Sequence, residues 1–210
     1  MPASKLDTVS RAVPPAQGAI VPASVVPIPR YTALAQALHW ATSALVLAVL
    51  PLAWVATALP RDSGWKPAMF QFHKSVGLTL LALVVARILW RALHPPPPEA
   101  TEPPALALLA KASHWLLYAI FLIMPVSGYL LSAYNGSTTQ YFYLFAIPGF
   151  EKDPALHDAF KGMHLVGQWA VYALVGLHVA ATAWHVAMRR DYVLERMLPE
   201  QDPRTLRRGR

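Results

Sequence analysis

Four long apolar segments, separated by short polar or proline-rich stretches, dominate the hydrophobic pattern of the chain. They cover approximately Thr32–Leu59, Phe70–Leu93, Ser113–Ala133 and Met163–Met188. A helix needs about 20 predominantly apolar residues to cross a hydrocarbon core of about 30 Å, and each segment is at least that long. The pattern therefore predicts an all-α membrane protein built as a bundle of four transmembrane helices.

The stretches outside these segments divide the chain into three parts. Residues 1–30 are rich in proline and contain no unbroken apolar run of the kind a signal peptide requires, so we expect a disordered cytoplasmic extension. Residues 31–190 form the predicted transmembrane domain, and residues 191–210 form a basic cytoplasmic tail. The aromatic-rich loop over residues 134–162 is expected to form a cap on the membrane surface.

Composition and charge agree with a membrane location. The chain is 55% hydrophobic and only 14% charged, and it carries a formal net charge of +7. Placing both termini on the same side of the membrane collects 13 of the 18 Lys and Arg residues there. The positive-inside rule then puts both termini in the cytoplasm. The basic tail is interpreted as a topology signal or a lipid-headgroup contact, in preference to a nucleic-acid site.

The absence of cysteine restricts the chemistry that the chain can perform. With no cysteine among the 210 residues, thiolate metal sites, iron–sulfur clusters, disulfides and covalent haem attachment are excluded. Any bound metal must therefore have histidine or oxygen ligands.

Six of the eight histidines lie in or at the edge of the apolar segments, and only His94 and His157 lie in loops. Ionisable side chains within a membrane are costly and usually mark function. His164 and His178 are 14 residues apart, which is about 21 Å along a helix and within about 40° of the same face. The last apolar segment thus presents two imidazoles on one face at two depths.

Distances from the flanking basic residues suggest which histidines share a level. His39 and His178 match at an inner level, and His73 and His164 match at an outer level. His114 matches His185 at the cytoplasmic edge. Two histidine pairs about 20 Å apart in a four-helix bundle suit two haem b groups, each with one imidazole on either side of the iron.

Two other interpretations of these histidines stay open. They could form a proton relay in a transporter, or they could link the helices by hydrogen bonds. Zinc or copper is disfavoured, because such a site needs three or four ligands at one level.

Arg87 adds an argument for haem. It follows His73 by 14 residues on the same helical face, which places it near the inner pair. The four apolar segments contain no Asp or Glu to neutralise it, and a haem propionate would supply the anion. The alternative is that Arg87 extends to the cytoplasmic surface.

The residues around these positions resemble those of bacterial cytochrome b561, a family of four-helix, di-haem, quinone-linked cytochromes that includes superoxide oxidase. The resemblance covers about residues 31–199, and the first 30 residues lie outside it. Its motifs are "ALHW" around His39, "FHKSVG" around His73, "MPVSGYL", "YN" at Tyr134, "KGMH" before His164, "GLHVAA" around His178 and "DYVLERMLP". The resemblance implies that His39 and His178 hold an inner haem and that His73 and His164 hold an outer one.

The resemblance also implies a reaction, in which superoxide gives electrons on the outer side and ubiquinone receives them near the cytoplasmic side. Lys74 and Lys161 flank the outer ligands and could attract the superoxide anion, or they could be ordinary interfacial lysines. His114 and His185 are candidates for the quinone site, where imidazoles can relay protons, or else they are ordinary interface residues.

A different function remains open beside superoxide oxidation. The chain could be a haem relay subunit that carries electrons between quinone and a separate dehydrogenase or hydrogenase. The sequence has no soluble redox domain of its own, so a relay would need a separate partner protein.

Overall fold

The computed structural model describes residues 28–98 and 103–200, which form four long helices. These are α1 (Ala33–Ala58), α2 (Trp65–Leu93), α3 (Pro104–Tyr134) and α4 (Pro154–Trp184), and α4 continues into a single π-helical turn, η1 (His185–Arg189). All four are long and apolar enough to cross a membrane. The prediction of an all-α, four-helix membrane fold is confirmed.

Three of the helices begin earlier than the apolar pattern indicated, α2 by five residues and α3 and α4 by nine each. The pattern marks the part of a helix suited to hydrocarbon and not its true start. Both α3 and α4 begin with proline in their first turn, where no backbone donor is needed. The Asp153 carboxylate also caps α4 by accepting a hydrogen bond of 3.0 Å from the Leu156 amide. The loop between α3 and α4 is therefore shorter than expected.

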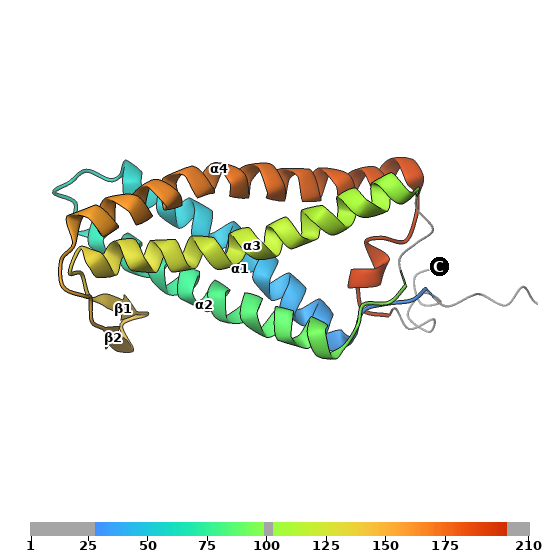
Figure 1. Ribbon diagram of the computed structural model, residues 1–210, viewed down its shortest axis with the longest axis horizontal. Coiled ribbons are helices and arrows are strands. Elements are labelled where there is room, and N and C mark those ends of the chain that lie inside the picture. The colour runs from blue at the N-terminus through green and yellow to red at the C-terminus, as the bar shows by residue number, and fades with distance from the viewer. Residues whose placement is uncertain (1–27, 99–102, 201–210) are drawn as a thin grey trace, which may run out of the picture.

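The helices pack as two antiparallel pairs (Figure 1). α1 lies against α2, α3 lies against α4, and the two pairs meet where α2 contacts α3. A small core of Val46, Leu80, Val84 and Tyr118 joins α1, α2 and α3. Many other large apolar side chains are exposed, for example Leu47 on α1 and Val166 on α4. Apolar surface on this scale is typical of helices whose outer faces contact lipid.

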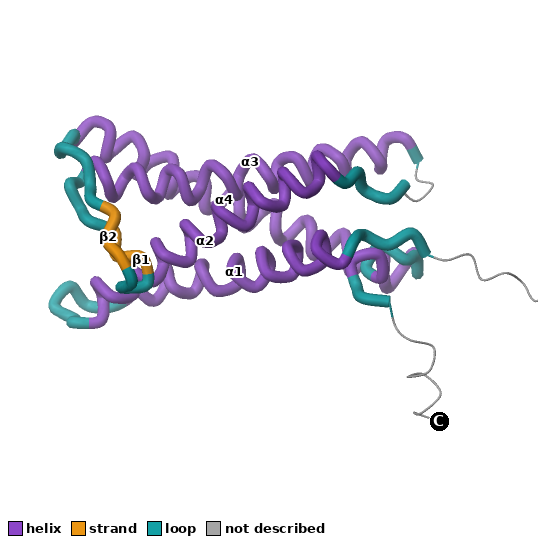
Figure 2. The backbone as a smooth tube through the Cα atoms, turned by 90° about the horizontal axis from the view of Figure 1, so that it is seen from below, coloured by secondary structure: helices purple, strands orange, loops and turns teal. Residues whose placement is uncertain are grey.

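The loop that follows α3 folds into a two-stranded antiparallel hairpin. Strand β1 (Thr139–Tyr141) pairs with β2 (Phe145–Ile147), with Gln140 opposite Ala146. Figures 1 and 2 show the hairpin beside the end of the bundle where α2 begins. The expected aromatic cap thus has a regular structure, and it is held against one helix.

At the opposite end of the bundle, the segment that follows η1 folds back toward the start of α1. Arg30 donates hydrogen bonds of 2.7 Å to the carbonyls of Glu195 and Leu198, and the Trp40 indole donates one of 2.7 Å to the Met197 carbonyl. A short 3-10 turn, η2 (Glu195–Met197), lies within this segment. The first part of the predicted tail is therefore packed on the bundle. Residues 1–27 of the predicted extension and residues 201–210 of the tail lie outside the described residues.

Candidate functional site

Two pairs of imidazoles meet between α4 and the α1–α2 pair. The ring centres of His73 on α2 and His164 on α4 are 6.2 Å apart, with the ring planes at 90°. The ring centres of His39 on α1 and His178 on α4 are 6.3 Å apart. The structure thus brings together both pairs that helical depth predicted.

The separation within each pair suits one metal ion between two rings. Two imidazoles that bind a metal from opposite sides through bonds of about 2.0–2.1 Å have ring centres roughly 6 Å apart. Both pairs have this spacing, and in each pair the two rings come from different helices. The spacing of the rings therefore fits two centres, each with two imidazole ligands.

Hydrogen bonds to the outer pair select the form of imidazole that a metal requires. Nδ1 of His73 lies 3.0 Å from the Val49 carbonyl oxygen, and Nδ1 of His164 lies 3.0 Å from the Met124 carbonyl oxygen. A carbonyl can only accept, so both Nδ1 atoms carry the hydrogen and each Nε2 keeps its lone pair. This is the usual arrangement of a metal-binding histidine, whose second nitrogen donates to a backbone carbonyl.

Close packing also positions His164. Ser127 is almost fully buried, and its hydroxyl lies 3.1 Å from Nδ1 of His164. A methyl group at Gly128 would stand only 2.8 Å from Cε1 of the same ring. The absence of a side chain at Gly128 therefore gives the imidazole the space it occupies.

The inner pair has additional neighbours. His114 lies beside His178, with ring centres 5.6 Å apart, and Arg87 is within electrostatic range of His39, His114 and His178. Nδ1 of His39 is buried and has no hydrogen-bonding partner among the described residues. A buried polar atom without a partner is costly, so this ring suits a position beside a bound group.

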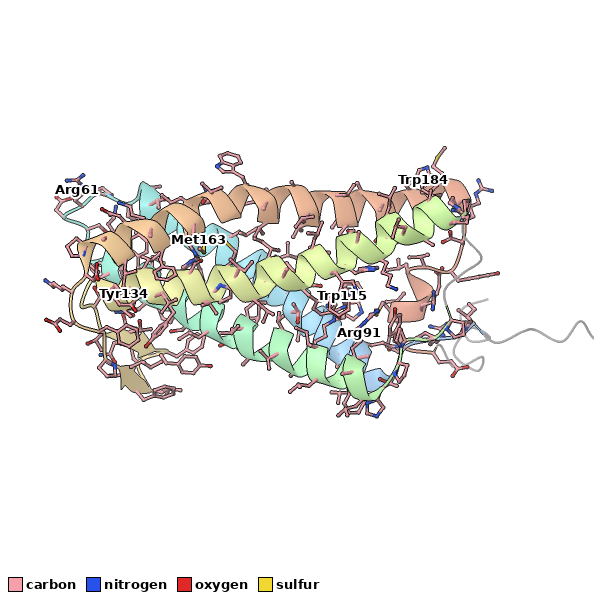
Figure 3. All side chains as sticks on the ribbon, in the orientation of Figure 1. Arg61, Arg91, Trp115, Tyr134, Met163 and Trp184 are labelled. Carbon is pink, nitrogen blue, oxygen red and sulfur yellow. The ribbon has the colours of Figure 1, made fainter. Side chains whose placement is uncertain are left out.

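Arg87 is half-buried, with its guanidinium carbon 5.4 Å from the centre of the Tyr118 ring. With Arg91 and Trp90 it lines a small cavity that Met197 of the returning segment helps to close. Figure 3 places Arg91 and Trp115 toward the returning segment and Arg61 and Tyr134 at the other end of the bundle. Arg87 therefore lies inside the bundle near the inner pair, where its positive charge could meet an anionic group.

The expected match of His114 with His185 at one level is not what the structure shows. His114 contacts His178, which precedes His185 by seven residues or about 10 Å on α4. His185 instead donates from Nδ1 to the Asp191 carboxylate, and Arg189 Nε lies 3.6 Å from the same oxygen. This pairing depends on the π-helical turn and the left-handed Arg190, which reverse the chain after α4. π-helical turns of this kind are frequent at functional sites.

The two lysines beside the outer pair have different surroundings. Lys74 is half-buried and donates a hydrogen bond of 3.2 Å to the Ser132 hydroxyl on α3. Lys161 is exposed on α4. Both lie close in sequence to a histidine of the outer pair, but only Lys161 is exposed.

Sequence reasoning missed the contacts that hold the imidazoles in place. Ser127, Gly128 and the Met124 carbonyl all lie around Pro125, within the "MPVSGYL" motif, but the motif does not show that they meet His164. The proline removes a backbone donor inside a helix and so loosens the local hydrogen bonding. Asp191 was missed because its partnership with His185 depends on the chain reversal at Arg190.

Comparison with known proteins identifies the family of the chain. Residues 30–200 match the family described as prokaryotic cytochrome b561. The chain is 32% identical to cytochrome b561 homolog 2 of Escherichia coli over 80% of this chain and 91% of that protein. It is 31% identical to the probable superoxide oxidase CybB of Yersinia pestis over 82% of this chain and 97% of that protein. The chain therefore belongs to the prokaryotic cytochrome b561 family of multi-pass membrane haem proteins.

Proposed function

We propose that this protein is a di-haem b oxidoreductase of the bacterial inner membrane that passes electrons from superoxide to ubiquinone. The two imidazole pairs, each spaced for one metal ion and stacked at two depths along α4, are the observation that carries the proposal. The similarity to a probable superoxide oxidase supports superoxide as the donor.

In this proposal His73 and His164 hold the outer haem, and His39 and His178 hold the inner one. Arg87 neutralises a propionate of the inner haem. The haems supply one-electron redox chemistry when bound. Each haem would be held by two imidazoles, and the reaction would then need no bond between superoxide and iron.

The stoichiometry of the proposed reaction shows which reactants each end of the bundle must handle. Each superoxide gives up one electron and leaves as dioxygen. Two such electrons and two protons convert ubiquinone to ubiquinol. With both termini in the cytoplasm, the outer end must attract an anion, and the cytoplasmic end must supply protons.

At the outer end, we expect the double variant Lys74→Gln/Lys161→Gln to slow haem reduction by superoxide roughly tenfold at low ionic strength, because charges near the site raise the local concentration of the anion. Glutamine at position 74 still carries an N–H donor, so the change removes the charge and keeps a polar side chain. Stopped-flow absorbance at the reduced α-band measures the rate. Lys111→Gln, at the other end of the bundle, is the control. A difference that persists in high salt would contradict steering.

At the cytoplasmic end, we propose that His185 relays protons to the quinone and that Asp191 orients its ring, with His114 nearer the inner haem. Asp191→Asn should slow quinone reduction at least about tenfold, because general acid–base groups contribute that much or more. Reduction of the haems by superoxide should be unchanged. The matched control is Asp158→Asn, which alters a looser His–Asp pair, with 4.0 Å between His157 and Asp158, near the other end of α4. If both variants slow quinone reduction equally, the proposed role of His185 in proton transfer is wrong.

The whole proposal is tested by counting haems per chain with the pyridine haemochrome assay and then mixing the oxidised protein with a superoxide source. Two haems that reduce rapidly and turn over with ubiquinone support it. Two haems that ignore superoxide but accept electrons from quinol would instead make the protein a relay subunit with a separate partner. Protein purified without haem would contradict the proposal and favour the interpretation of the histidines as a proton relay in a transporter.

A further inference from the structure

α2 carries a stripe of polar side chains, which is unusual for a membrane helix. Each residue of the stripe contacts the hairpin through a polar atom. Gln71, Ser75 and Thr79 are spaced four residues apart and so share one face of the helix. The Gln71 side-chain carbonyl accepts from the Gln140 amide at 3.0 Å, and the Ser75 hydroxyl accepts from the Phe142 amide at 2.9 Å. The Thr79 and Tyr141 hydroxyls lie 2.9 Å apart.

These contacts satisfy the open edge of β1. A two-stranded hairpin leaves one edge of each strand without backbone partners, and in water that edge can bond to solvent. The Ser75 hydroxyl, whose single hydrogen is shared with the Gln71 backbone carbonyl at 2.8 Å, also lies 3.1 Å from the Gln140 carbonyl. The Gln71 side-chain amide donates to the Thr138 carbonyl at 3.3 Å. Ser75 is 0% exposed, so the contact is dry. A strand edge paired by helix side chains is what the low-dielectric side of a membrane requires.

The position of the hairpin along the length of the bundle can be inferred from Lys74, the residue before Ser75. Lys74 adjoins Ser75 and reaches Ser132 on α3, two residues before that helix ends at Tyr134. Two residues correspond to about 3 Å along a helix. The turn of the hairpin, bonded to Ser75, therefore lies near the level at which α3 ends, at the end of the bundle predicted to face outward.

The tip of the hairpin is apolar and exposed. Tyr143, Leu144 and Phe145 are 57%, 79% and 54% exposed, and residues 138–150 contain no charged side chain. Phe142 and Tyr143 have φ angles of 46° and 59°, a conformation that hairpin turns usually assign to Asn or Gly. Bulky aromatic residues at these strained positions indicate that their side chains have a role.

We propose that the tip, residues 142–145, is seated in the interfacial layer of the outer leaflet, with lipid as its partner. Aromatic side chains are enriched at this depth because their apolar rings and polar edges suit the headgroup boundary. The α2 stripe then ties this lipid anchor to the helix that carries His73. The inference depends on the membrane fold and not on the proposed reaction.

The experiment uses single cysteines, since the chain has none of its own. Leu144→Cys is compared with Leu47→Cys, 70% exposed in the middle of α1, and with Asp62→Cys in the outer loop that joins α1 to α2. Each variant is placed as one chain per lipid nanodisc and treated with a charged maleimide that does not enter lipid, and labelling is followed by mass spectrometry. A haem spectrum like that of the unsubstituted protein, and full labelling in denaturing detergent, show that each variant is folded and reactive. Tyr143→Cys replaces Leu144→Cys if the latter does not fold.

We expect the cysteine at position 144 to react at least about tenfold more slowly than the one at position 62 and to resemble the one at position 47. The reason is that the thiolate is the reactive form and apolar surroundings disfavour it. Labelling as fast as at position 62 would overturn the proposal. So would protection that appears in native membranes but not in single-chain nanodiscs, because the cover would then be a second copy or another protein.

Discussion

Alanine at any one of His39, His73, His164 or His178 is expected to leave the purified protein with about one haem in place of two. Each residue supplies half of a ligand pair, and the ring centres in the two pairs lie 6.3 and 6.2 Å apart. Alanine has no nitrogen that can bind a metal, so the haem of that pair would lose one of its two protein ligands. Haem content per chain, measured by pyridine haemochrome, gives the result directly.

Two histidines outside the pairs are the controls. His94 is exposed and stacks on Trp90 with ring centres 3.6 Å apart, and His157 lies 2.7 Å from the Leu131 carbonyl through Nδ1. Neither approaches a pair, so His94→Ala and His157→Ala should keep both haems. Loss of haem in these variants, with retention in the four others, would contradict the pairing argument.

His114→Ala is a sharper comparison within the inner cluster. His178 lies between His39 and His114, at 6.3 and 5.6 Å between ring centres. Only the His39 distance equals that of the outer pair to within 0.1 Å. We therefore expect His114→Ala to keep both haems and His39→Ala to lose one. The reverse result would make His114 the inner ligand.

Gly128→Ala is expected to lower the affinity of the outer haem selectively. The new methyl would stand 2.8 Å from Cε1 of His164, closer than side-chain carbons approach in folded proteins. The ring cannot yield without disturbing its hydrogen bonds to Met124 and Ser127. Overpacking costs about 1–3 kcal/mol, which weakens haem binding roughly 5- to 150-fold. Haem content should fall toward one per chain, and a redox titration with two steps should lose one of them.

Gly162→Ala is the matched control for this substitution. Gly162 is an exposed glycine of α4, and a methyl group there would meet nothing within 4 Å. Alanine at this position should keep both haems and slightly favour the helix. If both glycine variants lose the same amount of haem, the cause is a general effect on the helices and not the contact with His164.

Features that depend on local periodicity could be predicted from the amino-acid sequence. Four apolar segments predicted four membrane-spanning helices because crossing hydrocarbon requires a fixed number of apolar residues. The constant rise of a helix then converted the spacing of His164 and His178 into two depths. Matching those depths to His39 and His73 gave two pairs whose rings do meet in the structure.

Depth along a helix does not show which side chains of different helices contact one another, and these contacts are known only from the folded structure. The folded structure placed His114 beside His178 and gave His185 a partner, Asp191, through a chain reversal after a π-helical turn. It also supplied the carbonyls of Val49 and Met124 that orient the outer imidazoles. It joined the polar stripe on α2 to a hairpin about 65 residues away. These contacts depend on how helices rotate and pack against one another, and side-chain spacing along a single helix carries no information about that rotation.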